Sequence, residues 1–170
     1  MNRQLLVLPL LVAVLSSALV AGCGEAPAEP SARLPGAWRG KLVGTSGWLA
    51  TMKGIEFMYV FHADGTMTES SNYDAFPPGP PAYGVWRQTG ARQYEARYEV
   101  FLTKAVGIVD EISKGNGWVP NGHGVLSEKM TLSDDGKVFE STIRFDFFDP
   151  QGKPVEGGGE ATNHAERIRF

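Results

Sequence analysis

The chain has 170 residues, of which 42% are hydrophobic, so it is long enough and apolar enough to form one domain with a core. Its formal net charge of −3 argues against a nucleic-acid-binding protein, because such proteins usually carry a basic surface. Cysteine occurs once, which excludes a disulfide within the chain.

Residues 1–22 have the three parts of a cleaved export signal. Arg3 and the free amino terminus supply positive charge, residues 5–20 form an uncharged apolar run, and the small residues Ala21 and Gly22 follow. The apolar run is shorter than the roughly 20 residues that a membrane-spanning helix needs. The alternative is an ordinary secretory signal with a chance cysteine beside its cleavage site.

The segment Val20-Ala21-Gly22-Cys23 resembles the lipobox of bacterial lipoproteins. This resemblance implies that Cys23 becomes the first residue of the mature chain and carries lipid, so that membrane lipid is its partner. It also implies an extracytoplasmic, lipid-anchored location in the cell envelope. Because Gly24 rather than Asp follows the cysteine, the resemblance favours the outer membrane if the organism is Gram-negative.

Residues 24–35 contain three prolines and small residues without apolar periodicity, which predicts a flexible linker. We therefore expect three parts in the chain: a signal peptide over 1–22, the lipidated Cys23 with its linker over 23–35, and a folded domain over 36–170. That domain has to be stable without disulfides.

From Gly36 onward the sequence predicts an all-β domain. Apolar and polar residues alternate along several segments, most clearly over 139–147, which is typical of half-buried strands. Asp64-Gly65, Asp135-Gly136 and Gln151-Gly152 predict hairpin turns. About eight strands are expected, over residues 36–44, 54–63, 66–73, 82–88, 92–103, 122–133, 137–148 and 154–169. The proline-rich residues 76–81 are expected to form a loop, and residues 104–121 a loop with at most a helical turn.

Eight amphipathic antiparallel strands can bury their apolar faces as a barrel or as a sandwich. Short hairpins between consecutive strands favour an up-and-down barrel, which also leaves no unpaired strand edge. The interior of an eight-stranded barrel is just wide enough to be filled by side chains or to hold one small ligand.

Gly36-Ala37-Trp38 in the first strand, with Arg167 and Arg169 in the last, resembles the lipocalin and wider calycin pattern. The segments 61–66 and 84–87 also resemble small bacterial lipocalin-like and allene-oxide-cyclase-like barrels. The resemblance covers roughly residues 36–170 in layout. It implies that Trp38 closes one end of the barrel and that an arginine of the last strand packs on its ring through a cation–π contact.

Glu128 is the most informative polar residue of the predicted strands, because it shares a face with Leu126, Met130 and Leu132. It points into the barrel, where a carboxyl must find a partner or stay protonated, or a local bulge turns it outward. With Glu128, the candidates for lining a ligand cavity are Tyr59, Tyr94, Tyr98 and Phe145. A wider aromatic set can line that cavity or form a packed core, namely Trp38, Trp48, Trp86, Trp118, Phe57, Tyr59, Tyr73, Tyr83, Tyr94 and Tyr98.

No established catalytic, metal-binding or cofactor-binding motif occurs in the sequence. The histidines His62, His123 and His164 fall in different predicted strands without metal-ligand spacing. No serine lies in a G-x-S-x-G or S-x-x-K motif. We therefore assign no catalytic residue, metal or cofactor, and we expect no nucleic acid as a partner.

The leading hypothesis is a non-enzymatic binding module for a small apolar or amphipathic ligand. One alternative is a small barrel enzyme, cyclase- or isomerase-like, that uses Glu128 and a tyrosine. The other is a structural envelope protein whose barrel has a solid core. The sequence does not predict an oligomeric state.

Overall fold

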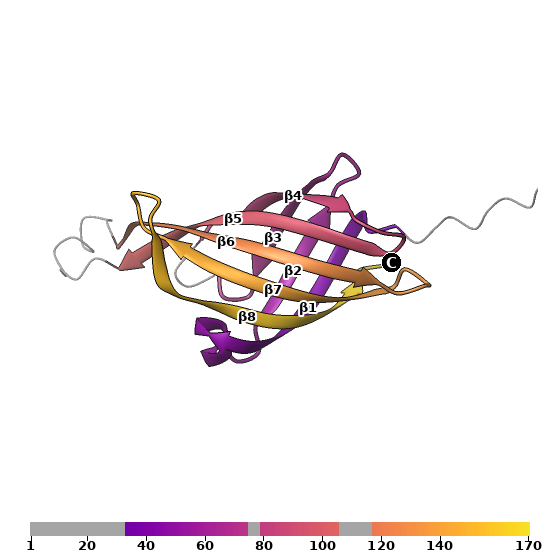
Figure 1. The fold of residues 1–170 in the computed structure, drawn as a ribbon, viewed down its shortest axis with the longest axis horizontal. Helices are drawn as coiled ribbons and strands as arrows, with labels where there is room; N and C mark the ends of the chain where they lie inside the picture. Colours follow the sequence, from indigo (N-terminus) through magenta and orange to yellow (C-terminus); the bar gives the residue numbers. More distant parts are fainter. Residues whose placement is uncertain (1–32, 75–78, 106–116) are drawn as a thin grey trace, which may run out of the picture.

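The computed structural model describes residues 33–74, 79–105 and 117–170. Over these residues the chain forms a closed up-and-down antiparallel barrel of eight strands, which confirms the predicted fold class (Figure 1). The elements are β1 (Gly36–Gly47), the 3-10 helix η1 (Trp48–Thr51), β2 (Glu56–Phe61), β3 (Thr66–Ser71), β4 (Ala82–Gln88), β5 (Gln93–Ala105), β6 (Trp118–Leu132), β7 (Val138–Phe148) and β8 (Pro154–Arg167). The signal, Cys23, most of the linker, residues 75–78 with the start of the proline-rich loop, and residues 106–116 lie outside the described residues.

The three predicted hairpin turns share one backbone arrangement. Gly65, Gly136 and Gly152 have φ angles of 88°, 64° and 77°, a conformation that glycine adopts without steric cost. The N–H of each glycine donates to the carbonyl oxygen three residues earlier, at 3.2, 3.0 and 2.9 Å. These turns connect β2 to β3, β6 to β7 and β7 to β8, so each fixes the register of a neighbouring pair of strands.

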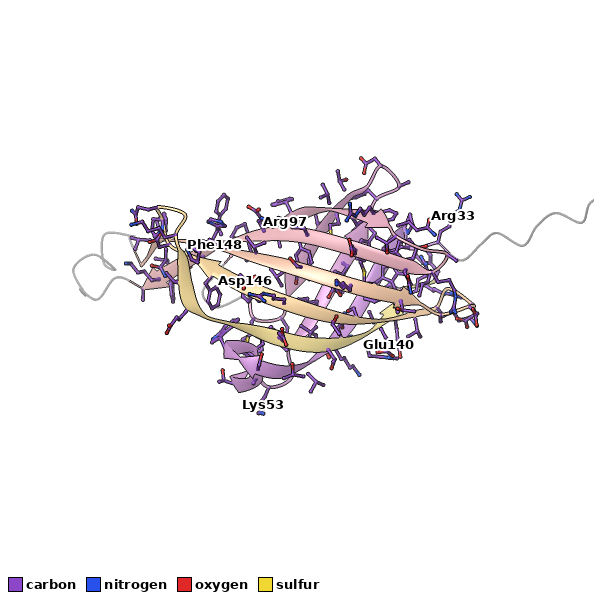
Figure 2. The ribbon with its side chains drawn as sticks, viewed as in Figure 1. Arg33, Lys53, Arg97, Glu140, Asp146 and Phe148 are labelled. Atoms are coloured by element: carbon purple, nitrogen blue, oxygen red, sulfur yellow. The ribbon has the colours of Figure 1, made fainter. Side chains whose placement is uncertain are left out.

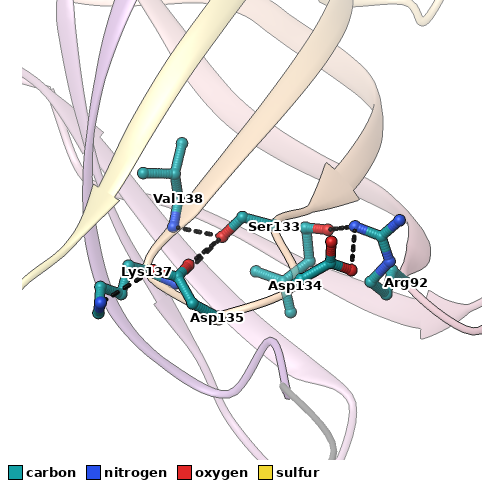
Figure 3. Close-up of polar contacts among 7 residues, drawn as sticks. Arg92, Ser133, Asp134, Asp135, Lys137 and Val138 are labelled. Atoms are coloured by element: carbon teal, nitrogen blue, oxygen red, sulfur yellow. Dashed lines mark hydrogen bonds and ion pairs between the residues drawn. The ribbon is translucent and has the colours of Figure 1, made fainter.

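Side chains reinforce the turn between β6 and β7 (Figure 3). The Ser133 hydroxyl donates to Asp135 at 2.8 Å and accepts the Val138 N–H at 3.1 Å. An ion pair of 2.9 Å joins Asp134 to Arg92, which lies in the turn between β4 and β5. Two neighbouring turns are thereby connected at the same end of the barrel.

The two ends of the barrel differ. One end, called the Trp38 end below, contains residues 33–35, the C-terminus and the turns after β2, β4 and β6 (Figure 1). The opposite end, called the η1 end, contains η1 and the turn between β7 and β8. Leu34 and Trp38 are fully buried at the first end, and Leu49 of η1 is 1% exposed at the second. Apolar side chains therefore cover the core at both ends.

Alternation along the strands separates a packed interior from a polar exterior. The inward side chains form one continuous hydrophobic cluster that extends along the barrel. The outward side chains include many charged and hydroxyl-bearing residues, and Arg97, Glu140 and Asp146 project away from the strands (Figure 2). Among the described residues, no helix has the length and apolar character that crossing a membrane would require.

Two features depart most from the predicted elements. The β5–β6 hairpin is longer than expected, because β5 continues to Ala105 and β6 already begins at Trp118. The pairing shifts register between Phe101 and Thr103, and this irregularity accommodates Pro120 within β6. The helix η1 was not predicted, and it packs against both β1 and β8.

Candidate functional site

Polar side chains from five strands converge inside the barrel. Glu128 lies on the inward face of β6 together with the buried Leu126 and Met130, because alternate side chains of a strand point to the same side. Since Glu128 is only 1% exposed, the alternative of an outward-turning bulge is wrong. The group around its carboxyl, called the interior polar cluster, consists of Tyr59, Tyr98, Glu128, Ser141 and Asn163.

The Glu128 carboxyl accepts hydrogen bonds on both oxygens. Tyr98 Oη donates to Oε2 at 2.9 Å, and Ser141 Oγ donates to Oε1 at 2.5 Å. Tyr59 Oη and Asn163 Nδ2 approach Oε1 at 3.4 Å each. The amide of Asn163 also donates to Tyr59 Oη at 3.1 Å. The cluster is therefore a connected network, and it holds the carboxyl in one position.

Glu69 of β3 brings a second carboxyl into the interior. It is 6% exposed and lies directly opposite Tyr59 in the pairing of β2 with β3. Burial raises its pKa well above the ordinary value of 4.5, and the nearby carboxyls of Asp74 and Glu128 raise it further. Glu69 therefore favours its protonated, uncharged form.

Burial also controls the protonation of the cluster itself. It raises the pKa of Glu128, while hydrogen bonds from Ser141, Tyr98, Asn163 and Tyr59 oppose that increase. Burial, together with the charge of Glu128, raises the pKa of Tyr59 and Tyr98 well above 10.0. Both phenols consequently keep their protons and remain hydrogen-bond donors.

Two buried oxygens at this site lack a hydrogen-bond partner among the described residues: Glu69 Oε1 and Asn163 Oδ1. Leaving a polar group buried and unpaired costs about 1–3 kcal/mol. Gly40 of β1 makes the position of the Asn163 amide possible, because a Cβ at residue 40 would lie 2.3 Å from Asn163 Oδ1. The absence of a side chain at Gly40 thus leaves room for Asn163 Oδ1, which has no hydrogen-bond partner among the described residues.

The structure places Arg167 over Trp38, with the guanidinium carbon 4.1 Å from the centroid of the ring. Trp38 Nε1 donates to the Leu34 carbonyl at 2.9 Å. Arg167 also donates to the carbonyls of Pro35 and Gly136, both at 2.8 Å. Arg169, the other arginine considered for this contact, follows the end of β8 and is exposed.

The aromatic residues predicted to line a cavity do not all lie together. Tyr59 and Tyr98 belong to the interior polar cluster. Tyr94 is buried near the Trp38 end with its ring 5.8 Å from that of Trp86. Phe145 is buried towards the η1 end, where it contacts Trp48 and Phe147 at ring distances of 5.9 and 4.5 Å.

Four members of the wider aromatic set are on the surface instead of in a cavity or core. Trp48, Tyr73, Tyr83 and Trp118 have exposed fractions of 43%, 42%, 61% and 37%. Tyr83 alternates with the inward Ala82 and therefore faces outward, while Trp48, Tyr73 and Trp118 lie at or beyond strand ends. Aromatic character alone did not indicate burial at these positions.

The histidines occupy separate surface positions. His62 is exposed after β2, and His123 stacks on Phe148 with a centroid distance of 5.0 Å. His164 lies 2.5 Å from Glu140, and the hydrogen bond between them raises the pKa of His164. In the described part of the chain, no group of three or more His, Cys, Asp or Glu side chains is arranged to hold a metal ion.

The outer surface of the barrel carries a shallow saddle of about 840 Å³ across β4 to β8. Ser127, Thr142 and Thr162 lie along it, and Arg97 and Arg144 stand beside them. Both arginines pair with acidic residues of their own strands, Glu99 at 3.4 Å and Asp146 at 3.0 Å. These paired charges on an open surface make the saddle a weaker candidate site than the interior polar cluster.

Sequence reasoning missed Glu69 and Asn163. Glu69 follows Met67 at the spacing of one strand face, and Asn163 lies between Ala161 and Ala165 at the same spacing. That spacing could have identified both residues as inward-facing once the strands were assigned.

The sequence matches no protein-family model. A comparison with curated proteins also finds no match. The candidate site therefore stands on its own geometry.

Proposed function

We propose that this protein is an extracytoplasmic, lipid-anchored binding protein that holds a small amphipathic ligand inside its barrel. The polar part of the ligand lies at the interior polar cluster, and its apolar part contacts the surrounding core residues. One observation carries this proposal: Glu69 Oε1 and Asn163 Oδ1 are buried inside the barrel without hydrogen-bond partners among the described residues. A ligand that supplies these hydrogen bonds would remove the cost of leaving them unmade.

The fold supports this proposal in two further ways. An eight-stranded barrel is wide enough for one small ligand. Both ends are covered, but the Trp38 end is also fastened by the hydrogen bonds of Trp38 and Arg167, so we place ligand entry at the η1 end. Entry there requires the inward aromatic side chains to adjust, as expected for a site that closes around its ligand.

A matched pair of variants tests binding inside the barrel. Ala161 is 2% exposed and faces the interior, whereas the adjacent Thr162 faces outward. We expect the chain of residues 24–170 to bind N-phenyl-1-naphthylamine, a neutral apolar fluorophore, with an increase in fluorescence. Ala161→Phe should weaken binding at least about tenfold by filling interior space, and Thr162→Phe should leave it unchanged. Absence of binding by the unaltered chain would favour the solid-core alternative.

Lipid anchorage through Cys23 is the second part of the proposal. Its support is the lipobox-like segment before Cys23, with an export signal ahead of it. One acyl chain binds a membrane only marginally, whereas two or three anchor it stably. The expected location is therefore the cell envelope, at the outer membrane if the organism is Gram-negative.

Labelling with radioactive palmitate in a bacterial host tests this anchorage. The unaltered chain should incorporate label, and globomycin should block its maturation. Cys23→Ser should abolish both properties and release the protein from the membrane fraction. Unchanged maturation of the Cys23→Ser chain would refute lipidation.

The contact between Tyr98 and Glu128 favours one second candidate, an acid–base enzyme of the barrel type. A buried carboxyl with a raised pKa, 2.9 Å from a phenol, can transfer a proton to a bound substrate. Compounds that bind the chain should then be chemically altered on incubation, and Glu128→Gln should stop that conversion while retaining binding. Mass spectrometry that recovers every bound compound unchanged would eliminate this candidate.

A further inference from the structure

We infer that the ligand is a primary amine with an apolar tail, and that its protonated amino group lies between Glu69 and Glu128. This inference rests on the proposed function, since it concerns the same site. It adds the chemical class of the ligand's polar group. The hydrogen-bonding atoms and the charges inside the barrel indicate that class.

The first argument is the balance of charge inside the barrel. Glu69 and Glu128 are both buried, whereas every lysine and arginine of the described residues is exposed apart from the half-buried Arg167. Arg167 is already engaged with Trp38 and with backbone carbonyls at the Trp38 end. The interior thus holds two acidic groups and no buried cation among the described residues. A cationic ligand would supply the opposite charge that lets a buried carboxyl ionise.

The second argument is the number and type of hydrogen-bonding atoms. An ammonium group has three N–H donors and no acceptor. The unpartnered oxygens of Glu69 and Asn163 and the carboxyl of Glu128 can receive those donors. A ligand hydroxyl has one donor and no charge, so it cannot stabilise an ionised carboxyl as an ammonium group does, and a ligand carboxylate has no donor.

The third argument is the position of Tyr59 between the two carboxyls. Its backbone lies opposite Glu69, and its hydroxyl reaches Glu128 at 3.4 Å. Tyr59 thus connects the strand position of Glu69 with the carboxyl of Glu128. One small cationic group can therefore interact with both.

Binding of an amine should release a proton. Glu69 lies opposite Tyr59 of β2, and the charges of Asp74 and Glu128 raise its pKa further. Glu128 faces Tyr59, Tyr98 of β5, and the neutral side chains of β7 and β8. All of these groups are acidic or neutral, so none supplies a positive charge that would favour an ionised carboxyl. An ammonium group favours an ionised carboxylate, and affinity should rise with pH while the amine stays protonated.

Isothermal titration of residues 24–170, which retain every described element, tests this inference with three probes of equal chain length. We expect octylamine at pH 8 to bind at least about tenfold more tightly than octan-1-ol, since charge-assisted hydrogen bonds are stronger than neutral ones. Octanoate should not bind. Titrations in buffers of different ionisation enthalpy should show proton release for octylamine and none for octan-1-ol.

Variants at the two carboxyls separate their role from a general effect on the fold. Glu69→Gln and Glu128→Gln should each reduce the preference for octylamine to about threefold or less, whereas Glu140→Gln, on the outer face, should preserve it. If Glu128→Gln does not fold, Glu69→Gln alone decides the result. Equal affinity for octylamine and octan-1-ol would overturn the amine inference but leave the proposed function intact. If none of the probes binds, both are wrong.

Discussion

Glu69 has a buried carboxyl whose pKa lies well above the ordinary value of 4.5. The folded chain therefore binds this proton more tightly than the unfolded chain does. The resulting stability is fully present below about pH 4.5 and is lost as pH rises through the raised pKa. Glu69 thus makes the fold less stable in alkaline than in mildly acidic solution.

Glu69→Gln should remove this part of the pH dependence, because glutamine does not titrate. At pH 8 the free energy of unfolding of the variant should exceed that of the unaltered chain by at least about 1 kcal/mol. This difference should shrink towards pH 5. Urea unfolding followed by tryptophan fluorescence at several pH values measures both quantities. Identical pH profiles for the two chains would mean that Glu69 ionises without penalty.

Arg167 and Arg169 provide a second comparison at the residue scale. Arg167→Lys should lower the free energy of unfolding by about 1–3 kcal/mol, because lysine cannot cover Trp38 and donate to several carbonyls at once. Arg169→Ala should change it by less than about 0.5 kcal/mol, since Arg169 is exposed after β8. Urea unfolding of both variants measures these changes. Equal losses in the free energy of unfolding would contradict a special role for Arg167.

The residues of the candidate site were only partly predictable. The inward face of β6 was visible in Leu126, Glu128 and Met130, but the sequence could not decide between an inward carboxyl and a bulge. That choice depends on Tyr98 and Ser141, which reach Glu128 from strands distant in sequence. Glu69 was missed because β3 is short and mostly polar, so its inward face has few apolar residues to mark it.

At the scale of the elements, turn chemistry and alternation predicted the strands well. Aspartate–glycine pairs at Asp64-Gly65 and Asp135-Gly136 identified hairpins correctly, because a positive φ angle at glycine is a local property. The extended β5–β6 hairpin could not be predicted from Pro120 and Gly122. Both residues normally mark strand ends, and here the pairing between strands accommodates them.

The helix η1 depends on a close backbone approach at Gly44. A Cβ at residue 44 would lie 2.0 Å from the Leu49 carbonyl oxygen, so Gly44→Ala has to displace η1 from β1. We expect a loss of about 1–3 kcal/mol in the free energy of unfolding. Gly117→Ala is the control, because a Cβ there would meet nothing within 4 Å among the described residues. If thermal unfolding shows almost no loss of stability for Gly44→Ala, then η1 is only loosely attached to β1.

At the scale of the whole molecule, the closed barrel and the proposed anchor together define an orientation. The described chain begins at Arg33 at the Trp38 end (Figure 1). About ten residues separate it from Cys23, and they can span at most roughly 35 Å. If Cys23 carries lipid, the Trp38 end is tethered close to the membrane. The opposite η1 end can then face away from the membrane, where a ligand would enter.

The central claim is that a small amphipathic ligand occupies the barrel at the interior polar cluster. Crystals of residues 24–170 grown with 8-bromooctan-1-ol test it most directly, because the anomalous signal of bromine locates the ligand. We predict a bromine peak inside the barrel, with the ligand hydroxyl within hydrogen-bonding distance of Glu69 or Asn163. A peak confined to the outer saddle beside Arg97 and Arg144, or no peak at all, would contradict the claim.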